Sequence, residues 1–228
     1  MLFMPFDPLF LVLVLPTMIF AMWAQHRVTS SFKQYSQIHI SRGMTGAQAA
    51  SEVLRQAGVY GVQIERVDGH LTDHFDPRDN AIRLSESVYD ATTVAAVGVA
   101  AHEAGHAIQH ANGYVPMRIR AAIIPVTNIG SKLAMPLILI GFLMGMTGLI
   151  NIGILLFGAV VIFQLVTLPV EFNASRRAIA SLESSAILAG DELAGSKRVL
   201  TAAALTYVGA LAVSLAQLIR LIAISRRR

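Results

Sequence analysis

Two histidines and a glutamate in the segment His102-Glu103-Ala104-Gly105-His106 have the types and spacing of a metal-dependent hydrolase. Residues four apart on a helix lie one above the other on the same face, so both imidazoles can reach one zinc ion. Glu103 then lies beside the metal, where it can take a proton from a metal-bound water and later pass it to a leaving amine. The spacing predicts His102 and His106 as zinc ligands and Glu103 as the general base of a peptidase.

The residues before this motif favour a helix that is buried inside the protein. The stretch from Ala91 to Ala101 is small and mostly apolar, and Val99, His102 and His106 recur at helical spacing. Polar side chains are costly to bury without a partner, and a metal ion would supply one.

Long uncharged stretches mark the rest of the chain, and over the full sequence 54% of residues are hydrophobic and only 14% are charged. This composition is too apolar for an ordinary soluble domain. No charged residue lies between Asp7 and Arg27, between Lys132 and Glu171, or between Arg198 and Arg220. A helix needs about 20 residues to cross a bilayer, so the first stretch is long enough for one span and the second for two. The third stretch is rich in alanine, typical of a span packed through small residues, although a buried soluble helix is an alternative there.

The middle stretch is predicted to form two helices, Leu133–Met146 and Ile152–Leu168. The expected turn between them is marked by Gly145, Gly148, Asn151 and Gly153. The fold class is therefore mainly α, an integral membrane protein with about four transmembrane helices.

The third metal ligand must come from elsewhere, because a catalytic zinc ion usually takes three protein ligands and a water. Two crossings in the middle stretch would return the chain to the side of the histidines, where Glu171 follows at once. Glu171 is favoured because a carboxylate beside an apolar span needs a partner. Spacing alone leaves Glu183 and Glu192 open.

A small α+β domain is predicted between the first span and the HExxH motif, next to the membrane. Thr45–Gly58 has a helix start signal and a terminal glycine, and Val62–Val67 alternates like a strand. Ala81–Leu84 is predicted as a second strand. A strand at this place in zincins commonly pairs with an extended substrate, and the alternative is an ordinary hairpin strand.

Several segments together resemble the YugP-type membrane neutral zinc metallopeptidases of bacteria, over nearly the whole chain. The segments are Ser41–Gly46, Leu71–Pro77, Arg83–Ser85, Val99–His110 and Gln164–Arg177. The resemblance implies a membrane zincin with one zinc ion per chain.

More distant relatives, the HtpX-like and CAAX-prenyl proteases, share HExxH followed by a Glu-x-x-x-Asp motif whose glutamate binds zinc. This similarity implies Glu171 as the third ligand. Ser175 stands where those relatives have an aspartate that orients a histidine. The orienting group is therefore expected from Asn173 or Asp191.

Other functions can be weighed on the same residues. A metzincin is excluded, because Gln109 and Asn112 occupy the positions of its glycine and third histidine. An intramembrane, site-2-like metalloprotease stays open, because the stretch before HExxH is uncharged, and so does a non-catalytic membrane scaffold with a residual metal site. The remaining histidines, which have no metal-binding spacing and are expected to be surface or structural, are His26, His39, His70, His74 and His110.

Lysines and arginines near the span ends predict a multi-pass protein of the cell membrane with a cytoplasmic catalytic side. On that side lie Arg27, Lys33, Arg118, Arg120, Lys132, Arg176, Arg177, Lys197 and Arg198. Arg220 and Arg226 to Arg228 conflict with this orientation if the last helix spans. The chain has no cysteine, which excludes disulfides and a cysteine nucleophile.

The predicted division of the chain has five parts: a first transmembrane helix (1–26), a catalytic domain with the HExxH helix (27–131), a transmembrane hairpin (132–170), a third-ligand helix (171–198), and a last transmembrane helix with a basic tail (199–228). The expected partners are a peptide or membrane-protein substrate and the lipid bilayer. Nothing in the sequence suggests nucleic acid, and the oligomeric state is not indicated.

Overall fold

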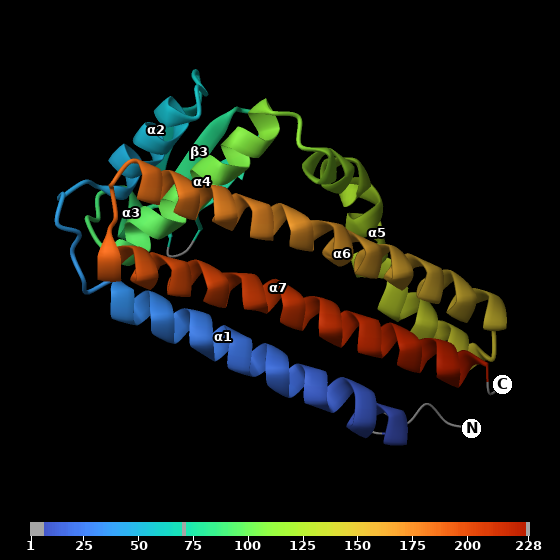
Figure 1. Ribbon diagram of the computed structural model, residues 1–228. Helices are drawn as coiled ribbons and strands as arrows, with labels where there is room; N and C mark the ends of the chain where they lie inside the picture. Colours follow the sequence, from blue (N-terminus) through green and yellow to red (C-terminus); the bar gives the residue numbers. More distant parts are fainter. Residues whose placement is uncertain (1–6, 70–71, 227–228) are drawn as a thin grey trace. The chain divides into compact units, whose positions relative to one another are not determined.

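Helices make up most of the computed structural model, which describes residues 7–69 and 72–226 (Figure 1). The elements in chain order are η1 (Phe10–Val14), α1 (Leu15–Tyr35), α2 (Gly46–Gln56), β1 (Gln63–Val67), β2 (His74–Asp76), β3 (Ala81–Ser85), α3 (Glu86–Tyr89), α4 (Val94–Ala111), α5 (Val115–Met144), α6 (Thr147–Ser184) and α7 (Gly190–Ser225). The mainly α fold class with a small sheet is confirmed.

The chain divides into two compact units. The first, here called the α+β unit, consists of Gln25–Met117 and Pro169–Ala204. The second, here called the helical unit, consists of Met1–Ala24, Arg118–Leu168 and Leu205–Arg228. Helix α6 belongs to both, because its apolar part up to Leu168 lies in the helical unit and the part from Pro169 onward lies in the α+β unit.

The sheet of the α+β unit places β3 between two neighbours. β1 pairs with β3 in parallel and β2 pairs with it antiparallel, so that Ile82 has Ile64 as its partner on one side and Phe75 on the other. The prediction that this strand pairs with a substrate is therefore wrong, because both of its hydrogen-bonding edges are occupied. The other interpretation, an ordinary hairpin strand, describes β3, which follows β2 through a turn with Asn80 at a φ of 50°.

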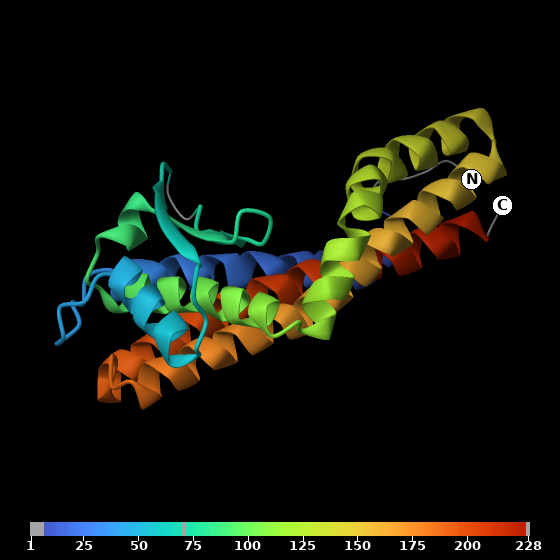
Figure 2. The same ribbon diagram turned by 90° about the horizontal axis from the view of Figure 1, so that it is seen from above.

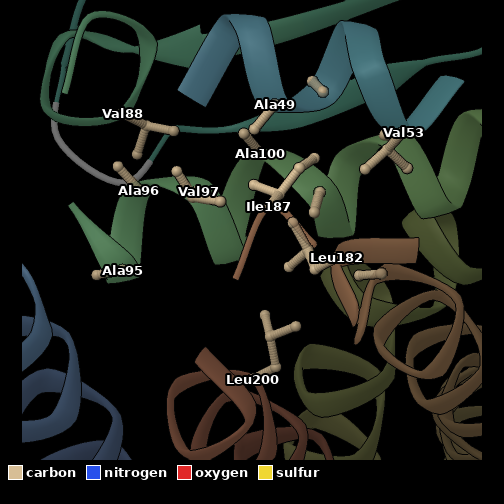
Figure 3. Packing of buried hydrophobic residues seen from close by; sticks show 14 of the residues in the cluster. Ala49, Val53, Val88, Ala95, Ala96, Val97, Ala100, Leu182, Ile187 and Leu200 are labelled. Atoms are coloured by element: carbon tan, nitrogen blue, oxygen red, sulfur yellow. The ribbon is translucent and has the colours of Figure 1, made fainter. Parts of the chain in front are cut away.

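Helix α4 lies in the middle of the hydrophobic core of the α+β unit (Figure 3). On one side Ala49 and Val53 of α2 pack against it, and on the other side lie Leu182 of α6 and Ile187 of the α6–α7 connection. A helix that is covered on several sides has little room for large side chains. This explains the small residues of α4, among them the fully buried Ala100.

Within residues 7–69 and 72–226, four helices are long and apolar enough to cross a membrane: α1 with η1, α5, α6 and α7. In the helical unit α5 and α6 form an antiparallel hairpin that packs closely through glycines (Figure 2). A Cβ atom on Gly130 would lie 2.8 Å from the carbonyl oxygen of Leu156, and one on Gly153 would lie 2.8 Å from that of Ala134. Such close backbone approach is typical of helices packed inside a membrane.

The turn between α5 and α6 is shorter than the sequence predicted. α5 ends at Met144 and α6 begins at Thr147, so the turn consists of Gly145, at a φ of +68°, and Met146. Gly148, Asn151 and Gly153 belong to α6. The prediction failed because a glycine in a membrane helix can serve close packing, as Gly153 does, instead of ending the helix.

Arg220 of α7 forms a buried ion pair with Asp7 inside the helical unit. Its side chain is 3% exposed, and its Nε and Nη2 atoms donate to Asp7 Oδ2 at 2.9 and 2.7 Å. The other Asp7 oxygen accepts from the backbone N–H of Phe10 at 2.9 Å, at the start of the first helix. The two charges offset each other, so Arg220 does not act as a free positive charge near the end of the last helix.

Candidate metal centre

The two histidines of the HExxH motif point toward one carboxylate. Thr93 begins α4 by accepting a hydrogen bond from the backbone N–H of Ala96, and the helix continues through both histidines. The rings of His102 and His106 lie one turn apart, with centroids 4.7 Å apart and planes at 84°. The Nε2 atoms of both rings face Glu171 on α6.

Glu171 is nearly fully buried, at 2% exposure. Its Oε2 atom lies 3.3 Å from His102 Nε2 and 3.5 Å from His106 Nε2. The candidate ligand atoms of these three residues all lie within 4.8 Å of one another. The structure therefore brings together the three residues that the sequence predicted as metal ligands.

The two other glutamates that spacing had left open lie elsewhere. Glu183 is exposed near the end of α6. Glu192, near the start of α7, accepts a hydrogen bond from the backbone N–H of Ser41 at 2.8 Å. Neither residue belongs to the histidine and glutamate cluster of the described chain.

Helices α4 and α6 can approach closely at this cluster because Gly105 has no side chain. A Cβ atom on Gly105 would lie 2.6 Å from the carbonyl oxygen of Ala174. One turn of α4 further on, Gln109 Nε2 donates to the carbonyl oxygen of Val170 at 2.8 Å. The glycine of the motif thus meets a packing requirement, and it places the histidines within reach of Glu171.

The second ring nitrogens of both histidines have partners of their own. His102 Nδ1 lies 3.1 Å from the hydroxyl of Ser175, and His106 Nδ1 lies 3.0 Å from Gln109 Oε1. The prediction that Asn173 or Asp191 contacts a histidine is wrong. The Asn173 side chain reaches Gln109 instead, at 3.0 Å, and Asp191 is exposed in the first turn of α7.

Gln109 was missed as a functional residue, although the sequence holds a signal for it. It follows His106 by three positions, which places both residues on the same face of the helix. A glutamine on such an apolar, buried helix needs hydrogen-bond partners, and His106 lies one turn earlier on the same face of the helix.

The chemistry of the ligand atoms in this cluster and the distances between them fit a zinc ion. Two imidazole nitrogens and one carboxylate form a ligand set that catalytic zinc uses, with a fourth position left for water. Tetrahedral zinc with bonds of about 2.0–2.1 Å has neighbouring ligand atoms about 3.3–3.4 Å apart. The distances from Glu171 Oε2 to the two histidines, 3.3 and 3.5 Å, are close to that value.

Negative charge around His106 favours a cation at this place. Burial alone would lower the pKa of His106, but the hydrogen bond to Glu171 and the charges of Glu103 and Glu171 outweigh it, so the pKa is raised above its ordinary value. Glu103 is itself buried on α4, directly after His102. A proton and a divalent cation would therefore compete for this imidazole.

Comparison with known proteins gives the family. A family model described as "Putative neutral zinc metallopeptidase" matches residues 10–226. The chain belongs to this family. The chain is similar to "Putative membrane protease YugP" of Bacillus subtilis (strain 168), with 46% identity over 216 residues. The aligned region covers 95% of this chain and 96% of that relative. No solved protein structure matches the chain significantly.

Family membership confirms the resemblance seen in the sequence. Together with the four apolar helices, it indicates a membrane protein.

The other described histidines lie outside the metal cluster. His26 is exposed on α1, and His110 lies against the ring of Phe75. His39 Nδ1 contacts Thr92 Oγ1 at 2.8 Å, and His74 Nδ1 contacts the carbonyl oxygen of Thr72 at 2.8 Å. His70 is outside the described residues.

Proposed function

We propose that this chain is a membrane-bound, zinc-dependent endopeptidase in which His102, His106 and Glu171 hold one zinc ion per chain. The observation that carries the proposal is the convergence of both histidine Nε2 atoms on the Glu171 carboxylate at 3.3 and 3.5 Å. Membership of a zinc metallopeptidase family supports it. The substrate class is a peptide or a segment of a membrane protein.

Each residue of the proposed site has a separate task. When bound, zinc lowers the pKa of water and polarises the peptide carbonyl. Glu103 accepts the proton of the attacking water and then delivers it to the leaving nitrogen. Ser175 and Gln109 hold the imidazoles of His102 and His106 from behind, through the Nδ1 atoms, so that both Nε2 atoms stay turned toward Glu171.

The two competing functions fit the structure less well. A scaffold with a structural zinc ion would need four protein ligands, and the cluster in the described residues offers three. An intramembrane protease would carry HExxH within a span, but α4 is not among the four helices of the described chain that could cross a membrane. Helix α4 packs instead in the core of the α+β unit.

Removing the metal should abolish peptide hydrolysis. Purified wild-type protein treated with 1,10-phenanthroline is expected to lose hydrolysis of an unfolded protein such as casein, and stoichiometric zinc should restore it, because the proposed reaction depends on a metal-activated water. The isomer 1,7-phenanthroline, which does not chelate, is the matched control. Hydrolysis that persists in protein shown to contain no zinc would exclude this mechanism.

We also propose that the catalytic side is cytoplasmic, from the lysines and arginines near the span ends. Topology reporters fused after residue 120 and after residue 180 should both report the cytoplasm, and a reporter in the turn at Gly145 should report the opposite side. This is expected because α5 and α6 form a hairpin, and each of them is long and apolar enough to cross a bilayer. Opposite results for the first two reporters would contradict the hairpin topology.

A further inference from the structure

We propose that Gln109 is a positioning residue that fixes the tautomer of His106, and that Asn173 and Arg177 fix the orientation of Gln109. The inference rests on the proposed zinc site and assigns three side chains that coordinate no metal. In the resulting tautomer the proton of His106 is on Nδ1, and the lone pair of Nε2 is directed toward Glu171 and the metal position.

The hydrogen bonds of Gln109 define which end of its amide faces the histidine. The side chain is fully buried, and its Nε2 atom lies 2.8 Å from the carbonyl oxygen of Val170. A backbone carbonyl can only accept, so the amide nitrogen must be the atom that faces α6. The amide oxygen then faces His106 Nδ1, at 3.0 Å.

Arg177 fixes the next member of the chain of hydrogen bonds. Its Nε atom donates to Asn173 Oδ1 at 2.8 Å, and Gln109 Nε2 donates to the same oxygen at 3.0 Å. A guanidinium group has donors only, so the Asn173 atom between the two nitrogens must be its oxygen. The network thus has a definite direction, set by the cation of Arg177 at one end and by a backbone carbonyl at the other.

The proton on His106 follows from this direction. Gln109 Oε1 is an acceptor only, so His106 Nδ1 must donate to it. A neutral imidazole with its proton on Nδ1 has its lone pair on Nε2, which lies 3.5 Å from Glu171 Oε2. His102 is held less strictly, because the Ser175 hydroxyl at its Nδ1 can either donate or accept.

The main test replaces Gln109 by Met, which has a similar shape and no hydrogen-bonding group. Zinc affinity of the full-length protein in detergent should fall about 10–100-fold, as is typical when the group behind a ligating histidine is lost. In the zinc-loaded wild-type protein, ¹⁵N NMR should show His106 bound through Nε2 with a protected Nδ1 proton. The Gln109→Met variant should lose that protection at His106, while His102 is unchanged.

A second set of variants keeps the test valid if Gln109→Met does not fold. Asn173 is only half-buried, and Asn173→Leu should weaken zinc binding by about tenfold, the lower end of the range for such groups. Asn173→Asp keeps an oxygen acceptor for both Gln109 and Arg177 and should retain wild-type affinity. Ser175→Ala is the control at the other histidine and should leave the Nδ1 proton of His106 protected.

The outcomes separate this inference from the proposed function. Wild-type zinc affinity together with an unchanged His106 proton in Gln109→Met would overturn the positioning role and leave the zinc site in place. Equal loss in Asn173→Asp and Asn173→Leu would also overturn it, because the acceptor oxygen would then be irrelevant. A wild-type protein that binds no zinc would overturn the proposed function and this inference with it.

Discussion

Glu103→Gln should retain zinc and fold but lose peptide hydrolysis by about 10²–10⁴-fold, the usual contribution of general acid–base catalysis. The amide has nearly the same shape as the carboxylate but cannot accept the proton of the attacking water. Glu103 is buried next to the histidines and is not a member of the metal cluster, so the metal should stay in place. The measurement pairs zinc content with the rate of casein hydrolysis for the same purified sample.

The matched control for this variant is Glu183→Gln, which makes the same chemical change at an exposed glutamate of α6. It should hydrolyse casein at the wild-type rate. Undiminished hydrolysis in Glu103→Gln would assign the general base to another residue. Loss of zinc together with activity would mean that Glu103 helps to hold the metal.

Glu171→Ala should weaken zinc binding by more than about 100-fold, which is more than the loss expected for a group behind a ligand. The substitution removes the only carboxylate within the cluster of ligand atoms and leaves two neutral imidazoles. Competition with a chelating dye, followed by absorbance, measures this affinity in the full-length protein.

Glu183→Ala and Glu192→Ala serve as controls, because Glu183 is exposed and Glu192 contacts Ser41. Both should bind zinc with nearly wild-type affinity. Retained affinity in Glu171→Ala, with loss in either control, would transfer the ligand role to that residue and contradict the proposed site.

The proximity of His102, His106 and Glu171 could be predicted from the sequence, because it follows from simple rules of helix geometry and membrane-span length. Helix geometry alone places His102 and His106 on one face. Glu171 could be favoured over two other glutamates because it directly follows an apolar stretch, and the structure places its carboxylate beside both histidines. Each step used either local helix geometry or the length of helix that a bilayer requires.

The contact behind His102 could not be predicted, because it depends on how closely two helices approach, whereas Gln109 lies behind His106 on the same helix. Ser175 contacts His102 Nδ1, although its side chain is shorter than those of Asn173 and Asp191, the two residues that the sequence predicted for such a contact. The approach depends on Gly105, whose missing side chain leaves room for the backbone of Ala174. Sequence spacing holds no information on that distance.

Strand order and the position of one turn were also beyond the sequence. The pattern of Ala81–Leu84 predicts a strand but not its neighbours, because pairing of β1 with β3 joins segments that are separated along the chain. The glycines from Gly145 to Gly153 illustrate a second ambiguity. A glycine can end a membrane helix or let it pack closely, and only the three-dimensional structure separates the two uses.

Zinc content is the most direct measurement of the central claim, that His102 and His106 hold a catalytic metal. Purified wild-type protein should contain about one zinc ion per chain, and the double variant His102→Ala, His106→Ala should contain none, because a single carboxylate cannot hold the ion. Thermal unfolding of both proteins in detergent should show that the variant is still folded. Full zinc occupancy in the folded double variant would contradict the assignment of this metal centre.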